Sequence, residues 1–243
     1  MIATRHFTEP TTDYWQRFED EATLPEGLRP GDGPWRYGYP AALPDGRVLL
    51  LPIRQVASDP TLAVASLIAN QASLSVVEDL GVMLARLLSP YAPDVIVGMP
   101  TLGLGFAPIV ARELGLERLV PLGYSRKYWY DDALSASVRS ITTPGGDKRV
   151  YLDPNLLPLL RGRTVALVDD AVSSGATLDA PWRLIESLGA EVLACGVVMR
   201  QGSRWADTLG PDRASKVVGV FDTPLLRAVP EGWVRREGTT GPA

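Results

Sequence analysis

Short apolar runs alternate with stretches of helical periodicity through the middle of the chain. The apolar runs have the length of buried strands and cover residues 94–99, 118–122, 164–168, 191–199 and 216–220. The helical patterns cover residues 70–89, 106–114 and 177–188. Strands that alternate with helices imply βαβ units and a mostly parallel sheet covered by helices on both faces. We therefore predict an α/β fold whose ligands bind beyond the carboxyl ends of the strands.

Composition narrows the chemistry that such a fold can carry. A net charge of −4 and a pI of about 5.1 argue against non-specific nucleic-acid binding and a polybasic membrane anchor. The single Cys195 excludes an intrachain disulfide and a multi-cysteine zinc site, and the single His6 leaves little room for triad or multi-histidine chemistry. The groups that remain to carry the protein's chemistry are carboxylates, hydroxyls, cationic side chains and backbone amides. The first residues lack the apolar run of a signal peptide, so we expect a cytoplasmic protein.

The most specific motif lies where the strand at residues 164–168 ends. This strand delivers two adjacent acids, Asp169 and Asp170, to its carboxyl end, and a loop of small residues then opens into a helix. Backbone N–H groups of such a loop and the positive end of the helix hold phosphate, and Ser174 and Thr177 add hydroxyl donors. Two carboxylates repel a phosphate but accept hydrogen bonds from sugar hydroxyls. The motif therefore predicts a ribose 5-phosphate ligand.

Asp169-Asp170 followed by Ser174-Gly175-Ala176-Thr177 resembles the phosphoribosyl pyrophosphate (PRPP) signature of type I phosphoribosyltransferases, in particular the adenine and xanthine type. The resemblance implies that the two acids are catalytic, because they hold the ribose 2- and 3-hydroxyls and stabilise the growing positive charge. It implies that the 5-phosphate binds at Ser173, Ser174, Gly175, Ala176 and Thr177. The alternative is an acid-plus-glycine turn in an unrelated α/β sheet; a P-loop would need a Gly-Lys-Ser/Thr sequence that this loop lacks.

The resemblance also implies a fold, a reaction and a cofactor. The expected fold is type I phosphoribosyltransferase-like: a central, mostly parallel sheet flanked by helices, with a hood formed by the chain ends. We expect one domain over residues 1–243, with a core at about 65–200 and with 1–64 and 201–243 as hood and terminal extensions. The implied reaction moves a phosphoribosyl group from PRPP to a nitrogen of a purine-like base and releases diphosphate. The implied cofactor is Mg²⁺, held mainly by PRPP; we further expect a homodimer without nucleic-acid or membrane partners.

A second loop is implied to bind the diphosphate. In the family, the loop after the strand at 94–99 turns backbone amides toward this group, and here it contains Thr101, Leu102 and Gly103. Glycine supplies the backbone freedom that close approach to an anion requires. Many relatives carry arginine in this loop, so part of the neutralising charge must come from elsewhere. Lys127 is the predicted source, and the alternative is a solvated basic turn.

The segment between Ser125 and Pro154 does not continue the alternation of strands and helices. A connection of this length inside a compact domain is either functional or inert. Read as a lid, it offers Arg139, Lys148 and Arg149 as cations that could close on the diphosphate. Read as an excursion, it leaves the same side chains in solvent.

Base selection is the least determined part of the site. Hypoxanthine-guanine-type relatives carry aspartate three positions after the second acid, where this chain has Ser173, which is nearer to the small residue of adenine-type relatives. Candidates for the base site are Arg200, Trp205 and Phe221, and the alternative for the aromatic residues is the apolar core. Two other functions stay open: a PRPP-sensing regulator and a catalytically inactive relative with the same pocket.

Overall fold

The computed structural model describes residues 13–31, 33–138 and 148–239 and divides the chain into two compact units. The core unit comprises Glu78–Val198 and Arg204–Gly219. The terminal unit comprises Met1–Val77, Met199–Ser203 and Val220–Ala243, and so joins both ends of the chain. A single domain with a core at about 65–200 stays a prediction.

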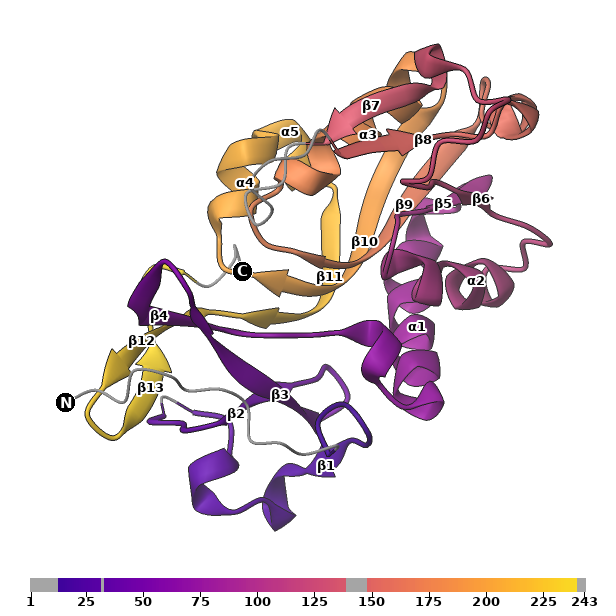
Figure 1. Cartoon of the computed structure of the whole chain (residues 1–243). Coiled ribbons are helices and arrows are strands. Elements are labelled where there is room, and N and C mark those ends of the chain that lie inside the picture. Colours follow the sequence, from indigo (N-terminus) through magenta and orange to yellow (C-terminus); the bar gives the residue numbers. More distant parts are fainter. Residues whose placement is uncertain (1–12, 32, 139–147, 240–243) are drawn as a thin grey trace. The chain divides into compact units, whose positions relative to one another are not determined.

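The core unit is built around a five-stranded sheet with the order β11-β10-β9-β5-β6 (Figure 1). The strands are β5 (Val95–Gly98), β6 (Val120–Pro121), β9 (Thr164–Val172), β10 (Glu191–Gln201) and β11 (Val217–Thr223), of which β10 and β11 continue into the terminal unit. Strand β5 pairs in parallel with β6 on one side and with β9 on the other. This arrangement confirms the predicted central parallel sheet. Strand β6 is shorter than the predicted run at 118–122, because it pairs with β5 only through Val120 and Pro121.

Helices cover this sheet, as predicted. The three predicted helices are α1 (Leu74–Leu88), α2 (Gly103–Glu113) and α3 (Ala176–Ser187), and the structure adds two that were not predicted, α4 (Arg204–Leu209) and α5 (Pro211–Ala214). Figure 1 shows α1 and α2 side by side, and their contact is so close that a Cβ on Gly81 would lie 2.7 Å from the side chain of Ile109. Helix α3 contributes Trp182 and Ile185 to an apolar cluster that also contains Leu167 of β9.

Between β6 and β9 the structure shows a hairpin that the sequence did not predict. It consists of β7 (Ser135–Val138) and β8 (Lys148–Tyr151), which pair antiparallel from Ser135↔Tyr151 to Val138↔Lys148. Residues 139–147, which include the lid candidate Arg139, lie outside the described residues. Val138 and Val150 are buried in the core cluster, which explains why this Ser-rich segment forms strands despite its weak apolar pattern.

The terminal unit holds an antiparallel sheet with the order β1-β3-β4-β12-β13, to which β2 adds by pairing with β3. Its strands are β1 (Glu19–Asp20), β2 (Gly38–Ala42), β3 (Arg47–Val56), β4 (Asp59–Ala65), β12 (Leu225–Val229) and β13 (Gly232–Arg235). Strand β12 pairs with β4 from Leu225↔Val64 to Arg227↔Leu62, so the two chain ends share one sheet. The predicted assembly of the chain ends is therefore confirmed.

Short 3-10 helices connect these elements and lie at Glu21–Thr23, Glu26–Leu28, Ala69–Gln71, Ser89–Tyr91, Asp132–Leu134 and Pro154–Leu159. Among the residues described by the structure, no helix has both the length and the apolar character needed to cross a bilayer.

Candidate functional site

Asp169 and Asp170 lie near the carboxyl end of strand β9, at the carboxyl edge of the core sheet. The strand continues through both acids to Val172, whereas the sequence predicted that it ends at Val168. Asp169 is 8% exposed and Asp170 is half-buried. The N–H of Asp170 donates to Oδ1 of Asp169 at 2.9 Å. This bond holds the Asp169 carboxyl against the backbone of Asp170.

This placement has an electrostatic cost. Burial raises the pKa of the Asp169 carboxyl well above its usual range, and the neighbouring Asp170 raises it further. Burial also raises the pKa of the Asp170 carboxyl. An N–H from Gly103 offsets part of the effect on Asp169. Because ionised carboxylates only accept hydrogen bonds, a ligand that donates hydroxyl groups would stabilise this pair.

The loop between β5 and α2 reaches the acids through a glycine. The peptide bond between Pro100 and Thr101 is cis, and helix α2 begins directly afterwards at Gly103. A Cβ on Gly103 would lie 2.6 Å from the Val168 carbonyl oxygen and 2.8 Å from Oδ1 of Asp169. The backbone freedom predicted for Gly103 is not what this position requires, because its φ is not positive. Glycine is required at this position because the start of α2 lies directly against β9, the acid strand that carries Asp169 and Asp170, and leaves no room for a side chain.

The small-residue loop after β9 turns sharply into helix α3. Gly175 precedes the helix with φ = +78°, a left-handed conformation that favours glycine. A Cβ there would also lie 3.0 Å from the Trp205 carbonyl oxygen. The N–H of Ala176 donates to Oγ of Ser174 at 3.4 Å, and Thr177 is exposed on the first turn. The loop therefore presents hydroxyl groups at the amino end of a 12-residue helix.

Tyr124 is a site residue that the sequence analysis did not identify. It follows strand β6, and so lies at the same sheet edge as the acids. Burial raises the pKa of Tyr124 to about 12, and the charges of Asp169 and Asp170 contribute to this rise. The Nζ of Lys148 lies 3.7 Å from the centroid of its ring. Its position agrees with the expectation that ligands bind beyond the carboxyl ends of the strands, but nothing in the sequence marked this tyrosine.

The other cations predicted for the diphosphate differ in their surroundings. Lys127 is exposed and donates to the Ser125 hydroxyl at 3.3 Å. Arg149 donates to the hydroxyl of Ser135 at 2.7 Å and to that of Ser137 at 3.1 Å, and so joins the two strands of the hairpin. Thr101 is exposed and Leu102 is half-buried beside Gly103. The loop before α2 therefore lies next to the acids, whereas the Lys127 side chain bonds to Ser125 within its own turn.

The three base-site candidates do not lie in one unit. Trp205 is fully buried in the apolar cluster of the core unit, and its backbone lies close against Gly175. Phe221 is buried in the terminal unit. Arg200, also in the terminal unit, donates Nε and Nη2 to the two carboxylate oxygens of Asp222 at 2.7 and 2.8 Å. A role of these residues in base binding stays a prediction.

Comparison with known proteins identifies the family. A family model described as the phosphoribosyl transferase domain matches residues 64–226, which is more than half of the chain. The chain belongs to the phosphoribosyltransferase family. The matched residues contain the acid strand, the loop before α3 and the loop before α2. The resemblance noted from the sequence is therefore confirmed at the level of the family.

The similarity to individual phosphoribosyltransferases is modest, at 29% and 36% sequence identity for two of them. The chain is 29% identical over 146 residues to a xanthine phosphoribosyltransferase of Chloroflexus aurantiacus, covering 60% of this chain and 67% of the relative. It is 36% identical over 117 residues to an adenine phosphoribosyltransferase of Nitrosococcus oceani, covering 47% of this chain and 64% of the relative. The chain thus spans about two thirds of the length of these relatives. A solved adenine phosphoribosyltransferase of Thermoanaerobacter pseudethanolicus is similar with a TM-score of 0.49 and 23% identity, over 61% of this chain and 81% of that one.

Proposed function

We propose that this phosphoribosyltransferase-family protein moves a phosphoribosyl group from PRPP to a nitrogen of a purine-like base and releases diphosphate. The observation that carries the proposal is the buried acid pair Asp169–Asp170 at the end of β9, followed by the hydroxyl-bearing loop at the amino end of α3. A sugar phosphate matches both halves of this arrangement, because its hydroxyls donate to carboxylates and its phosphate accepts from the loop.

Each part of the site has a role in this reaction. Departure of diphosphate leaves positive charge on the anomeric carbon, and the charge of Asp169 and Asp170 stabilises it. Backbone N–H groups and hydroxyls from Ser173, Ser174, Gly175, Ala176 and Thr177 hold the 5-phosphate. The amides of Thr101, Leu102 and Gly103 face the diphosphate, and Lys127 adds charge. Because Gly103 touches Asp169, the sugar and the diphosphate bind on adjoining surfaces.

The residues present fit a magnesium ion that is shared with PRPP. Within residues 13–31, 33–138 and 148–239, no group of three or more His, Cys, Asp or Glu side chains could hold a metal. The buried acid pair instead offers carboxylate oxygens, the ligands that Mg²⁺ prefers alongside phosphates and water. Asp170, the more exposed acid, would share the ion with oxygens of PRPP. When bound, Mg²⁺ supplies neutralising charge for the diphosphate.

The proposal also covers the class of base that accepts the phosphoribosyl group and the oligomeric state of the protein. The relatives named xanthine and adenine phosphoribosyltransferases support a purine-like acceptor. Ser173, at the position of the aspartate of hypoxanthine-guanine-type relatives, favours the adenine type. We further propose a cytoplasmic homodimer that acts on small molecules, without a nucleic-acid or membrane partner.

A thermal-shift titration tests whether the site binds its predicted ligand. PRPP with Mg²⁺ is expected to raise the melting temperature, because a ligand at 100 times its Kd adds about 2.7 kcal/mol to the free energy of unfolding. For a chain of this length that corresponds to a rise of roughly 5–10 °C. Ribose without phosphate serves as the control and should leave the melting temperature unchanged. Absence of a shift at millimolar PRPP would contradict the proposal.

The hydroxyl of Thr177 provides a test of the phosphate loop. The 5-phosphate is bound equally in the ground state and the transition state, so Thr177→Ala should weaken PRPP binding and leave turnover unchanged. Loss of a hydrogen bond to a charged group costs about 1.5–3 kcal/mol, which corresponds to a roughly 10- to 150-fold higher Kd. Ser187→Ala, at the opposite end of α3, is the matched control and should bind PRPP normally. Equal affinities in calorimetry for Thr177→Ala and the wild type would place the phosphate elsewhere.

A further inference from the structure

We propose that Tyr124 is a positioning residue that holds the Lys148 ammonium group at the carboxyl edge of the core sheet, where it neutralises the leaving diphosphate. This inference rests on the proposed function and assigns one cation to it. The alternative is that the Lys148 side chain rests on the tyrosine for structural reasons only, and the experiment below separates the two.

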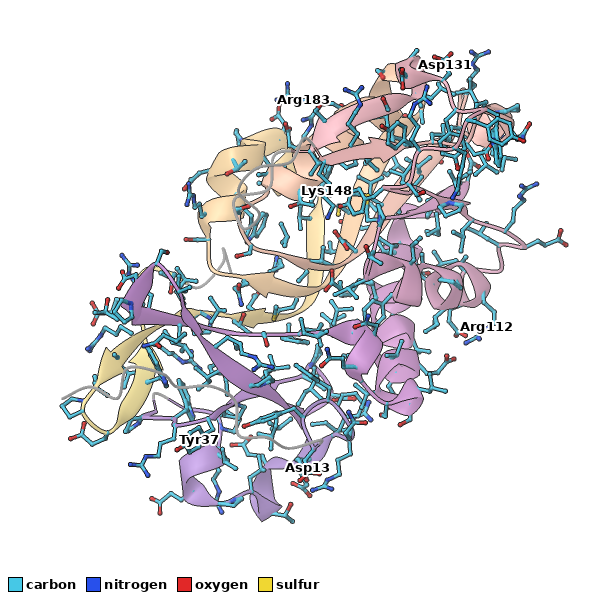
Figure 2. The ribbon with its side chains drawn as sticks, viewed as in Figure 1. Asp13, Tyr37, Arg112, Asp131, Lys148 and Arg183 are labelled. Carbon is cyan, nitrogen blue, oxygen red and sulfur yellow. The ribbon has the colours of Figure 1, made fainter. Side chains whose placement is uncertain are left out.

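The backbone fixes Tyr124 and Lys148 in register. The N–H of Gly123 donates to the carbonyl oxygen of Tyr151 at 3.1 Å, and the N–H of Tyr151 donates back to Gly123 at 2.8 Å. This bridge ties strand β8 to the residue directly before Tyr124. Lys148 begins the same strand, so the hairpin and the end of β6 carry the two side chains toward each other. Figure 2 labels Lys148 at the start of β8, away from Asp131 and Arg183, which lie at the margin of the core unit in this view.

The ring of Tyr124 holds the Lys148 ammonium group at the edge of the sheet where the acids also lie. The Lys148 Nζ lies 3.7 Å from the ring centroid, within the range of a cation–π interaction. Tyr124 follows β6, which is separated from the acid-bearing β9 only by β5, and the loop predicted to bind diphosphate follows β5. With a pKa of about 12, the phenol stays protonated at neutral pH and adds no negative charge to the site. The exposed lysine is thus held at the same sheet edge as the diphosphate loop.

The three other described cations of this segment have partners of their own, and Lys127 donates to the Ser125 hydroxyl at 3.3 Å. Arg126 forms an ion pair with Asp132 at 2.9 Å, and Arg149 donates to Ser135 and Ser137 within the hairpin. The loop at Thr101–Leu102 carries no cation of its own. Lys148 is therefore the cation that the described structure places on the Tyr124 ring at this edge of the sheet. Its ammonium group can turn from the ring face to a diphosphate oxygen without any change of the backbone, because lysine is a flexible point charge.

The inference is tested by calorimetric titration of inorganic diphosphate with Mg²⁺ into the full-length chain. Lys148→Met should weaken diphosphate binding about tenfold, the low end of the effect expected for a hydrogen bond to a charged group. Tyr124→Leu should match that loss, whereas Tyr124→Phe keeps the ring and should stay within about twofold of the wild type. The double variant Tyr124→Leu/Lys148→Met should bind no more weakly than Lys148→Met alone, because both changes remove one interaction. Arg118→Met removes one exposed charge at the amino end of β6 and should bind like the wild type.

Each outcome decides one question. If the wild type binds neither diphosphate nor PRPP, the proposed function fails. If the wild type binds both and Lys148→Met binds diphosphate equally well, the inference is wrong and the proposed function stands. If Tyr124→Leu adds its loss to that of Lys148→Met, Tyr124 does not act through the lysine, which also overturns the inference.

Discussion

Gly103→Ala is expected to weaken PRPP binding roughly 10- to 150-fold, since the loss of a hydrogen bond to a charged group costs about 1.5–3 kcal/mol. The physical reason is that an added methyl group would overlap the Val168 carbonyl oxygen and the Asp169 carboxylate, at 2.6 and 2.8 Å. Either the start of α2 or the acid strand must move, and the amides that face the diphosphate move with it. Overpacking of this kind also costs about 1–3 kcal/mol of stability. Calorimetry with PRPP and thermal melting measure the two effects.

Gly105→Ala is the matched control for this prediction. Gly105 lies two residues further along α2, and a Cβ there would meet no atom within 4 Å. Alanine in a helix is more favourable than glycine by up to about 1 kcal/mol, so this variant should melt slightly higher and bind PRPP normally. If the two variants behaved alike, close packing of α2 against the acid strand would not be what Gly103 provides.

Asp170→Asn is expected to lower turnover on the order of 10²-fold while it raises the melting temperature of the free protein. Turnover falls because the amide cannot stabilise positive charge on the sugar. Stability rises because burial raises the pKa of this carboxyl above its ordinary 3.8, so the folded protein at neutral pH carries an unfavourable charge. The gain should therefore be present well above pH 3.8 and vanish below it, where the carboxyl is protonated in both states. Steady-state kinetics and melting curves across pH measure these effects.

Asp94→Asn is the control with the opposite sign. Hydrogen bonds from the Thr164 backbone N–H and hydroxyl, each 3.0 Å long, lower the pKa of the Asp94 carboxyl. A lowered pKa contributes stability above the unfolded value that is lost as pH falls through the folded one. The variant should therefore melt no higher than the wild type and turn over normally. A rise in melting temperature for Asp94→Asn, or a fall for Asp170→Asn at neutral pH, would contradict this electrostatic account.

The acid strand and the loop after it were predictable because their chemistry is local. An apolar run, two acids, small residues and a helix occur in sequence order, so the motif at 165–178 could be interpreted without any distant contact. The same holds for α1 and α3, whose apolar faces repeat at helical spacing. The boundaries were less certain, since β9 continues through Asp169 and Asp170 to Val172.

The features that were missed depend on contacts between distant residues. The surroundings of Tyr124 depend on the bridge between its neighbour Gly123 and Tyr151, and on acids of another strand. Tertiary packing buries Trp205 against Gly175, which no local pattern indicates, and its role in base binding stays a prediction. The joining of the chain ends was expected only from the family resemblance, because the pairing of Leu225 with Val64 links distant residues that no local pattern marks.

Release of diphosphate from PRPP in the presence of single bases tests the central claim most directly. The wild-type protein with Mg²⁺ would be assayed with adenine, guanine, xanthine, hypoxanthine, uracil and orotate, with Asp170→Asn in parallel. The account predicts base-dependent release with at least one purine, reduced on the order of 10²-fold in the variant. If PRPP binds but no base gives release, a PRPP-sensing regulator would replace the enzyme. Release that is independent of any base, or equal in wild type and Asp170→Asn, would contradict the assignment of the acid pair.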